Sequence, residues 1–248
     1  MPLKEYKAWD KGTRVFHWLN VICVLGLGVL GTVILNSSGL GMSNDGKIAL
    51  KTIHVWFGYV FALNLCWRLI WAFFGNARVR WSAILPIKSG GLRGVVAYWK
   101  GFWSGQAPGY IGHSPLGRIA VTVILTMLTV QAATGLVLAG TDVYMPPFGA
   151  LIKEWVVAEG LSASEVKPYA PETVNPEAYA QMRAIRSPVV EIHELMFYAL
   201  LAMIVLHIAA VVLTDIRERS NIISSMFTGR KTFSDLPADA EEEDFLHK

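Results

Sequence analysis

Charged residues are absent from four long stretches of this chain, and this absence restricts the fold more than any other feature. The stretches are Val15–Asn44, Thr52–Trp67, Ile119–Thr141 and Leu195–Thr214. A bilayer core is about 30 Å thick, so a helix that spans it needs roughly 20 apolar residues. The second stretch reaches this length when Arg68 is included. The sequence therefore predicts an all-α integral membrane protein built as a four-transmembrane-helix bundle. We place the helices near residues 16–36, 51–74, 117–140 and 188–214.

Composition supports the membrane assignment. Only 17% of the residues are charged, and the mean hydropathy is +0.41, whereas a soluble domain carries about 25% charged residues. A secretory signal peptide is the alternative for the first stretch, but its apolar part would be about 7–15 residues long and end at a small-residue cleavage site. The first stretch is longer and ends in Asn36-Ser37-Ser38, which favours a retained helix.

The distribution of lysine and arginine predicts the orientation. Basic residues gather before the first helix, between the second and third, and after the fourth, whereas loop 141–187 is mixed, with six acidic and four basic residues. By the positive-inside rule, both termini are cytoplasmic and loop 141–187 is periplasmic. We therefore expect a multi-pass protein of the bacterial inner membrane. The net charge of +3 follows from this asymmetry and requires no nucleic-acid partner.

We predict two regions in the chain. Residues 1–232 form one membrane domain, and residues 233–248 form an acidic, mobile cytoplasmic tail. Ser114-Pro115 and Ser187-Pro188 are predicted starts of the third and fourth helices, because serine caps a helix and proline suits its first position. Two short helices are expected at the outer surface, near 148–159 and 177–184.

Four of the six histidines fall inside the predicted spans. They are His17, His54, His193 and His207, while His113 and His247 lie outside. Ionisable residues within a membrane span are rare and indicate a functional site by default. For any single histidine the alternative is a polar side chain that joins two helices. Four histidines at matched depths make that alternative much weaker.

The depths of these histidines predict two level pairs. His193 and His207 are fourteen residues apart on the fourth helix, which is about 21 Å along the axis and nearly on one face. His193 lies near the outer surface with His54, and His207 lies near the inner surface with His17. This arrangement fits two planar cofactors, each ligated by imidazole on both faces. Bis-histidine haem keeps no open position on the iron, which favours electron transfer.

Cationic side chains near these pairs are candidate partners for haem propionates. Arg14 and Arg68 would serve the inner haem, and Lys51, with Arg183 or Arg186, the outer one. The alternatives are ordinary positive-inside residues and a snorkelling arginine. Cys23 and Cys66 stand alone, and no C-x-x-C-H motif is present, so covalent c-type haem attachment is excluded.

Together these residues form motifs that resemble a known family, the di-haem cytochrome b subunits of bacterial nickel–iron hydrogenases. The wider family includes bacterial cytochrome b-561 and the b subunit of membrane formate dehydrogenase. The motifs are Arg14-Val-Phe-His17-Trp18, His54-x-x-x-Gly58, Arg68-x-x-Trp71-x-Phe-x-Gly75-Asn76, Gly112-His113-Ser-Pro115-Leu-Gly117 and Glu191-Ile-His193 followed by His207. The resemblance covers residues 5–232 and implies two b haems, ligated by His17 and His207 and by His54 and His193. It also implies electron transfer between a periplasmic redox partner and membrane quinone.

A quinone site needs hydrogen-bond partners and a proton route. His113 is the first candidate because its pKa lies near working pH, and its neighbours Ser114 and Arg118 could assist. The family often has asparagine where Ser114 stands, which leaves the role of Ser114 open. The alternative for His113 is a surface loop histidine, and we assign no role to His247.

Two other functions remain as alternatives. The first is a stand-alone oxidoreductase of the same fold that moves electrons between superoxide and quinone without a partner subunit. The second is a histidine-based metal-ion transporter. That function predicts acidic residues inside the spans, and the sequence has none away from their ends.

Overall fold

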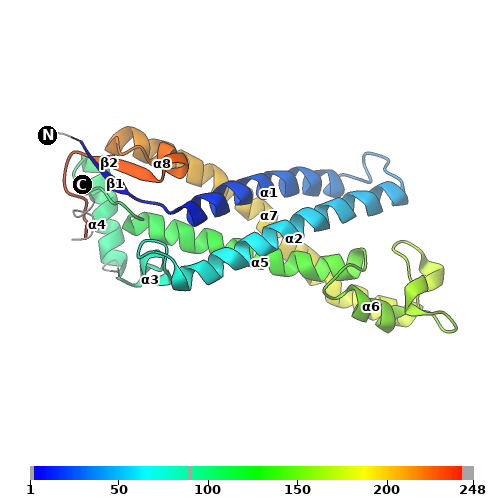
Figure 1. The fold of residues 1–248 in the computed structure, drawn as a ribbon. Coiled ribbons are helices and arrows are strands. Elements are labelled where there is room, and N and C mark those ends of the chain that lie inside the picture. The colour runs from blue at the N-terminus through cyan, green and yellow to red at the C-terminus, as the bar shows by residue number, and fades with distance from the viewer. Residues whose placement is uncertain (1–2, 89–90, 242–248) are drawn as a thin grey trace. The chain divides into compact units, whose positions relative to one another are not determined.

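The structure is a computed structural model that describes residues 3–88 and 91–241. Within these residues, four helices are long and apolar enough to cross a membrane: α1 (Lys11–Leu35), α2 (Asn44–Phe74), α5 (Pro115–Asp142) and α7 (Pro176–Glu218) (Figure 1). The prediction of an all-α bundle with four spans is therefore confirmed. The shorter elements are β1 (Lys4–Lys7), α3 (Trp81–Ile84), η1 (Pro86–Lys88), α4 (Gly91–Ser104), α6 (Gly149–Val156), η2 (Ala163–Glu165), η3 (Pro171–Thr173), α8 (Ile222–Thr228) and β2 (Arg230–Phe233).

Large apolar side chains cover the outside of the spans. Ile22, Leu25 and Val29 on α1 are each at least 60% exposed. In water so much apolar surface would favour association, whereas in a bilayer it contacts lipid. The helical backbone satisfies its own hydrogen bonds, as a lipid environment requires.

The fourth span begins earlier than predicted. Helix α7 starts at Pro176, so the expected start at Ser187-Pro188 is wrong, and Pro188 lies inside the helix. The side-chain oxygen of Asn175 accepts hydrogen bonds from the backbone N–H groups of Glu177 and Ala178, both at 3.0 Å. Asparagine is a strong helix cap and proline suits the position after it. This capped start lets one helix run through Pro188, although that proline donates no hydrogen bond.

Two other predicted elements are confirmed. Helix α5 begins at Pro115, and the hydroxyl of Ser114 accepts a hydrogen bond from the N–H of Gly117 at 3.2 Å. The short helix expected near 148–159 is α6. The helix expected near 177–184 is the first part of α7 rather than a separate element.

The chain divides into two compact units. The terminal unit comprises Met1–Leu19, Leu65–Thr126 and Leu201–Lys248, and the loop unit comprises Asn20–Asn64 and Met127–Leu200. Each span contributes one part to each unit. The terminal unit contains His17, His113 and His207, and the loop unit contains His54 and His193.

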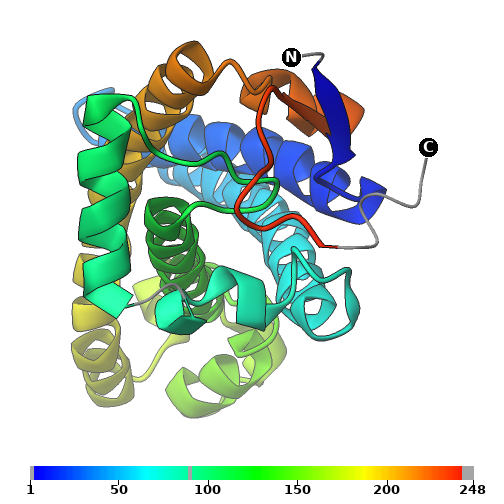
Figure 2. The same ribbon diagram turned by 90° about the vertical axis from the view of Figure 1, so that its left-hand side faces the viewer.

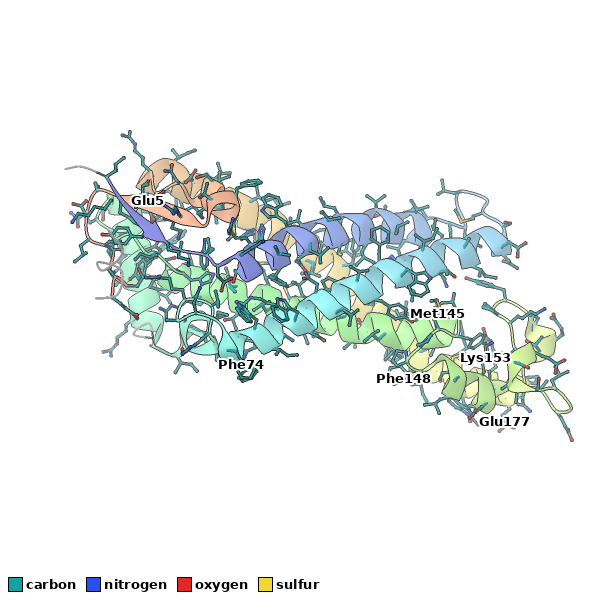
Figure 3. All side chains as sticks on the ribbon, in the orientation of Figure 1. Glu5, Phe74, Met145, Phe148, Lys153 and Glu177 are labelled. Atoms are coloured by element: carbon teal, nitrogen blue, oxygen red, sulfur yellow. The ribbon has the colours of Figure 1, made fainter. Side chains whose placement is uncertain are left out.

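The terminal unit joins the two ends of the chain. Strands β1 and β2 pair antiparallel, with Lys4 opposite Phe233 and Lys7 opposite Arg230, and Figure 2 shows them beside α8. Glu5, labelled in Figure 3, forms an exposed ion pair with Arg230 at 2.5 Å. The buried core beneath this sheet consists of Tyr6, Ala8, Trp9, Val79, Ile111 and Phe233.

The predicted tail differs from expectation over its first part. Phe233 is 7% exposed, and the Asp239 carboxylate accepts hydrogen bonds from the N–H groups of Ile111 at 2.7 Å and Gly112 at 2.8 Å. These contacts hold residues 233–241 against the loop before α5, so this part is packed rather than a free tail. Residues 242–248, with His247, lie outside the described residues.

The loop unit has its own small core, formed by the segment between α5 and α7 together with the first turns of α7. Val156, Val166, Val174 and Met182 are buried together, and a β-bridge joins Val157 to Val174. Figure 3 labels Phe148 and Lys153 in the segment that forms α6. The segment between α5 and α7 is thus folded, and it packs against the first turns of α7.

Candidate cofactor site

In the loop unit, the imidazoles of His54 and His193 face one another from α2 and α7. Their ring centroids are 6.4 Å apart and their planes meet at 72°. A histidine nitrogen binds a first-row metal at about 2.0–2.1 Å. Two such bonds, together with the radius of each ring, place the centroids about 6 Å apart. The observed separation fits one metal atom between the two rings, as the depth of these histidines predicted.

Hydrogen bonds around His193 select one tautomer of its ring, and the amide of Gln131 stands where a metal on Nε2 would bind. Its Nδ1 lies 2.8 Å from the hydroxyl oxygen of Thr134, and that hydroxyl donates to the carbonyl of Val130. Its Nε2 lies 3.1 Å from the amide nitrogen of Gln131, which can only donate. Both contacts select the tautomer with a proton on Nδ1 and a lone pair on Nε2. That tautomer is the one an Nε2-bound metal requires.

Two glycines lie directly against these rings. A Cβ atom added to Gly31 would lie 3.6 Å from Cε1 of His54, and one added to Gly135 would lie 3.3 Å from Cε1 of His193. The second distance is tighter than an ordinary contact, so a side chain at Gly135 would push the ring. In the structure they contact the candidate ligands themselves.

The cations near this pair share a carboxylate that sequence analysis missed. Lys51 lies 2.5 Å from Oδ2 of Asp142, and Arg186 donates to both oxygens of the same carboxylate. Two cations face one anion, so the cluster keeps a positive charge. That the cluster pairs with a haem propionate stays a prediction. Asp142 is the first acidic residue after the third uncharged stretch. This position in the sequence could have identified it as a partner for the nearby cations.

In the terminal unit, His17 on α1 and His207 on α7 interact electrostatically. Nδ1 of His17 is buried without a partner among the described residues, as is Nδ1 of His54. The His17 ring also lies edge-on to Trp18, with centroids 5.3 Å apart. These two histidines come from α1 and α7, as predicted.

Arg68 is a buried cation that the Asp10 carboxylate influences without forming an ion pair with it. Its side chain is 4% exposed, donates to the carbonyl of Val79 at 3.3 Å and lies 5.9 Å from the Phe16 ring. Among the described residues, none forms an ion pair with it. A buried guanidinium without an ion-pair partner is costly, so the site suits an anion such as a propionate. Arg14 instead donates to the carbonyl of Phe227.

The loop that carries His113 is held by two residues near the C-terminus. The Lys231 ammonium donates to the carbonyls of Tyr110 at 3.0 Å and Gly112 at 3.1 Å. Asp239 holds the neighbouring N–H groups of the same loop. Lys231 is only 4% exposed, although sequence analysis counted it as an ordinary cytoplasmic lysine. No local sequence pattern links it to a loop so far away along the chain.

His113 has an unusual electrostatic environment. Burial, followed by the nearby charges of Lys231, Arg68 and Arg118, lowers the pKa of His113 to about 3. Its Nδ1 is buried without a partner among the described residues, and its ring centroid lies 4.9 Å from that of Trp9. His113 is therefore a neutral imidazole at physiological pH, and the surface-histidine alternative does not describe it.

The three residues predicted for a quinone site lie together. Ser114 caps α5 next to His113, and the Arg118 guanidinium donates to the His113 carbonyl at 3.4 Å. Tyr98 from α4 interacts with the Ser114 side chain. Sequence analysis did not foresee α4 or Tyr98, because the segment between the second and third spans showed only its positive charge.

Comparison with known proteins agrees with the resemblance noted in the motifs. The family described as "Prokaryotic cytochrome b561" matches residues 8–229. The chain is 25% identical over 236 residues to a protein of Rhizobium leguminosarum bv. viciae named "Probable Ni/Fe-hydrogenase B-type cytochrome subunit", covering 92% of this chain and 89% of that protein. A protein of the same name from Cupriavidus necator is 23% identical over 241 residues, covering 94% and 89%.

A shorter match is found in Escherichia coli. The "Probable Ni/Fe-hydrogenase 1 B-type cytochrome subunit" of strain K12 is 27% identical over 149 residues, which is 54% of this chain and 60% of that protein. No solved structure gave a significant match.

Proposed function

This chain belongs to the prokaryotic cytochrome b561 family, and from that premise we propose that it holds two b haems, each between a pair of histidines. As a member of this family it is a multi-pass protein of the bacterial inner membrane that transfers electrons through b-type haem. His54 and His193 would ligate one iron, and His17 and His207 the other. Membership favours this function over the histidine-based transporter.

The observation that carries the proposal is the facing pair His54 and His193, with centroids 6.4 Å apart and a lone pair on Nε2 of His193 selected by its neighbours. The haem iron supplies one-electron chemistry when bound. The chain supplies the axial nitrogens, apolar surroundings that exclude water, and cations for the propionates. The buried Arg68 is the first candidate among these cations, because it is 4% exposed and forms no ion pair among the described residues.

We further propose an orientation for the protein in the membrane and a class of redox partner. The basic loops favour a cytoplasmic position for the termini and for the segment between α2 and α5, and residues 141–187 would then lie in the periplasm. The similar proteins are named as subunits that accompany nickel–iron hydrogenases. We therefore expect a hydrogenase, or another periplasmic redox protein, to dock near the folded loop of residues 141–187.

Membrane quinone is the proposed redox partner of the terminal unit. His113 carries an unpartnered buried Nδ1, and its pKa of about 3 keeps it neutral. A neutral imidazole can donate to or accept from a quinone oxygen. Arg118 and Lys231 add positive charge, which would stabilise the negative charge that builds up on a quinone as it is reduced.

Electron transfer to quinone can be tested with the purified full chain in lipid nanodiscs. The haems are reduced with a limiting amount of dithionite, a water-soluble ubiquinone analogue is added, and reoxidation is followed in the visible spectrum. We expect rapid reoxidation by quinone, slowed by at least about tenfold in His113→Asn, because a group that hydrogen-bonds the reacting oxygen contributes roughly 10²–10⁴-fold when it also transfers protons. Reduced haem that is stable in the presence of quinone would contradict the proposal.

A further inference from the structure

A chain of hydroxyl and carboxyl groups leads away from the proposed quinone site. Glu218, the last residue of α7, accepts a hydrogen bond from the Tyr98 hydroxyl at 3.0 Å. The Ser114 side chain interacts with the same hydroxyl. Ser114 is next to His113 and caps α5. All these residues belong to the terminal unit, and Figure 2 shows α4, which carries Tyr98, beside the last turns of α7.

The middle member of this chain is suited to passing protons. Tyr98 is 7% exposed, and burial, followed by the charge of Glu218, raises its pKa. Its hydroxyl therefore stays protonated and can accept a proton from one neighbour as it donates to the other. A side chain without a hydroxyl at this position, such as glycine, alanine or leucine, could not pass a proton between Glu218 and Ser114.

Glu218 is the member that exchanges protons with solvent. It is partly buried, and it forms no ion pair among residues 3–88 and 91–241. Its neighbour Arg217 turns elsewhere, donating to the carbonyl of Phe102 at 2.8 Å and lying 4.5 Å from the Trp103 ring. A carboxyl group bonded to a hydroxyl rather than held by a salt bridge can take up and release a proton. The charged group facing it from β2 is Lys231.

We propose that Glu218, Tyr98 and Ser114 form a proton path that serves the quinone site beside His113. The inference rests on the proposed quinone function and deepens it. Reduction of one quinone to a quinol takes two electrons, from the haems, and two protons, one for each carbonyl oxygen. Ser114 gives its hydroxyl proton to one of the two oxygens and receives one from Tyr98, while the other oxygen takes its proton from solvent water. Tyr98 is reprotonated by Glu218, and Glu218 by solvent water. Oxidation of a quinol runs the same steps in reverse.

The path can be tested by comparing two oxidants of the reduced haems. Reoxidation by a water-soluble ubiquinone analogue consumes protons, whereas reoxidation by ferricyanide consumes none. We expect Glu218→Gln and Tyr98→Phe to slow the quinone reaction at saturating quinone by about 10-fold to 100-fold, in line with the usual contribution of proton transfer. The quinone concentration at half-maximal rate, the haem content and the ferricyanide reaction should be unchanged.

Matched variants sharpen the test. Tyr110→Phe removes a hydroxyl from a ring that contacts Tyr98, with centroids 5.8 Å apart, but lies off the path and should behave like the wild type. Glu218→Asp keeps a carboxyl group and should retain most of the rate. Quinone rates in Glu218→Gln and Tyr98→Phe equal to the wild type would overturn the path, as would equal slowing with both oxidants. Failure of the wild-type protein to react with quinone would instead refute the proposed function on which the path depends.

Discussion

Thr134 holds the imidazole of His193, with 2.8 Å between its hydroxyl oxygen and Nδ1 of the ring. The hydroxyl donates to the carbonyl of Val130 on its own helix, so its oxygen is free to accept the Nδ1 proton. Helix α5 thus sets the tautomer and angle of a candidate ligand on α7. Because groups that orient a metal ligand typically change metal affinity by 10-fold to 100-fold, this contact predicts a measurable effect on cofactor binding.

Thr134→Val should weaken the haem between His54 and His193 while leaving the other haem in place. Valine keeps the shape of threonine but cannot accept the Nδ1 proton. We expect the rate at which this site loses its haem to excess apomyoglobin to rise by about 10-fold. Thr126→Val is the control, because the Thr126 hydroxyl bonds only the carbonyl of Thr122. Equal haem loss from both variants would contradict the role of Thr134.

Asp142→Asn should destabilise the loop unit. The change leaves the two cations Lys51 and Arg186 facing each other without a charge between them, and the side chains of the cluster are only 13–20% exposed. Removing one partner of a buried ion pair is strongly destabilising, here by up to about 3 kcal/mol. Thermal unfolding in detergent, followed by circular dichroism, measures the loss.

Arg230→Gln provides the comparison for that experiment. It breaks the ion pair with Glu5. The side chain of Arg230 is 62% exposed and that of Glu5 is 51% exposed. Exposed pairs contribute less than about 1 kcal/mol, so this variant should unfold within a few degrees of the wild type. Equal effects of the two variants would show that the cluster around Asp142 is not the stronger contact.

Acid should destabilise the protein partly through His113. The unfolded side chain has a pKa near 6.5, and the folded one about 3. Between these values the unfolded state binds more protons, so stability is complete above pH 6.5 and falls as the pH drops towards 3. At pH 5 this group costs up to about 2 kcal/mol. The loss of melting temperature between pH 7 and pH 5 should therefore be smaller in His113→Asn than in the wild type.

Asn175→Ala should loosen the first turns of α7. Asn175 caps this helix through two bonds of 3.0 Å, and the loss of such a cap costs about 1 kcal/mol. Hydrogen exchange of the amides in residues 176–186 should accelerate by roughly fivefold, which corresponds to that energy. Unchanged exchange there would place the true start of the helix nearer Pro188.

The sequence predicts the spans and the histidine pairs well because both depend on repeats along single helices. An uncharged run of membrane length, or two histidines fourteen residues apart on α7, constrains structure without knowledge of distant contacts. The start of α7 was missed although Asn175-Pro176 is a capping signal. Ser187-Pro188 offered the same signal closer to the apolar run.

The contacts around His113 could not be predicted from local patterns. Lys231 and Asp239 reach its loop only because β1 pairs with β2 and brings the C-terminus there. Asp142 and Tyr98 are likewise identified by their neighbours in space. A residue whose role depends on contacts with residues distant in the sequence shows no local pattern of hydrophobicity or charge. Its burial is decided only when the core folds.

The most direct test of the account is to count haems in the purified wild-type protein and in His54→Ala and His207→Ala, by the pyridine haemochrome absorbance per chain. We predict two b haems in the wild type and one in each variant, with the remaining haem differing in its reduced spectrum or midpoint potential between the two variants. A single haem in the wild type, or two haems surviving either substitution, would contradict the paired-histidine sites.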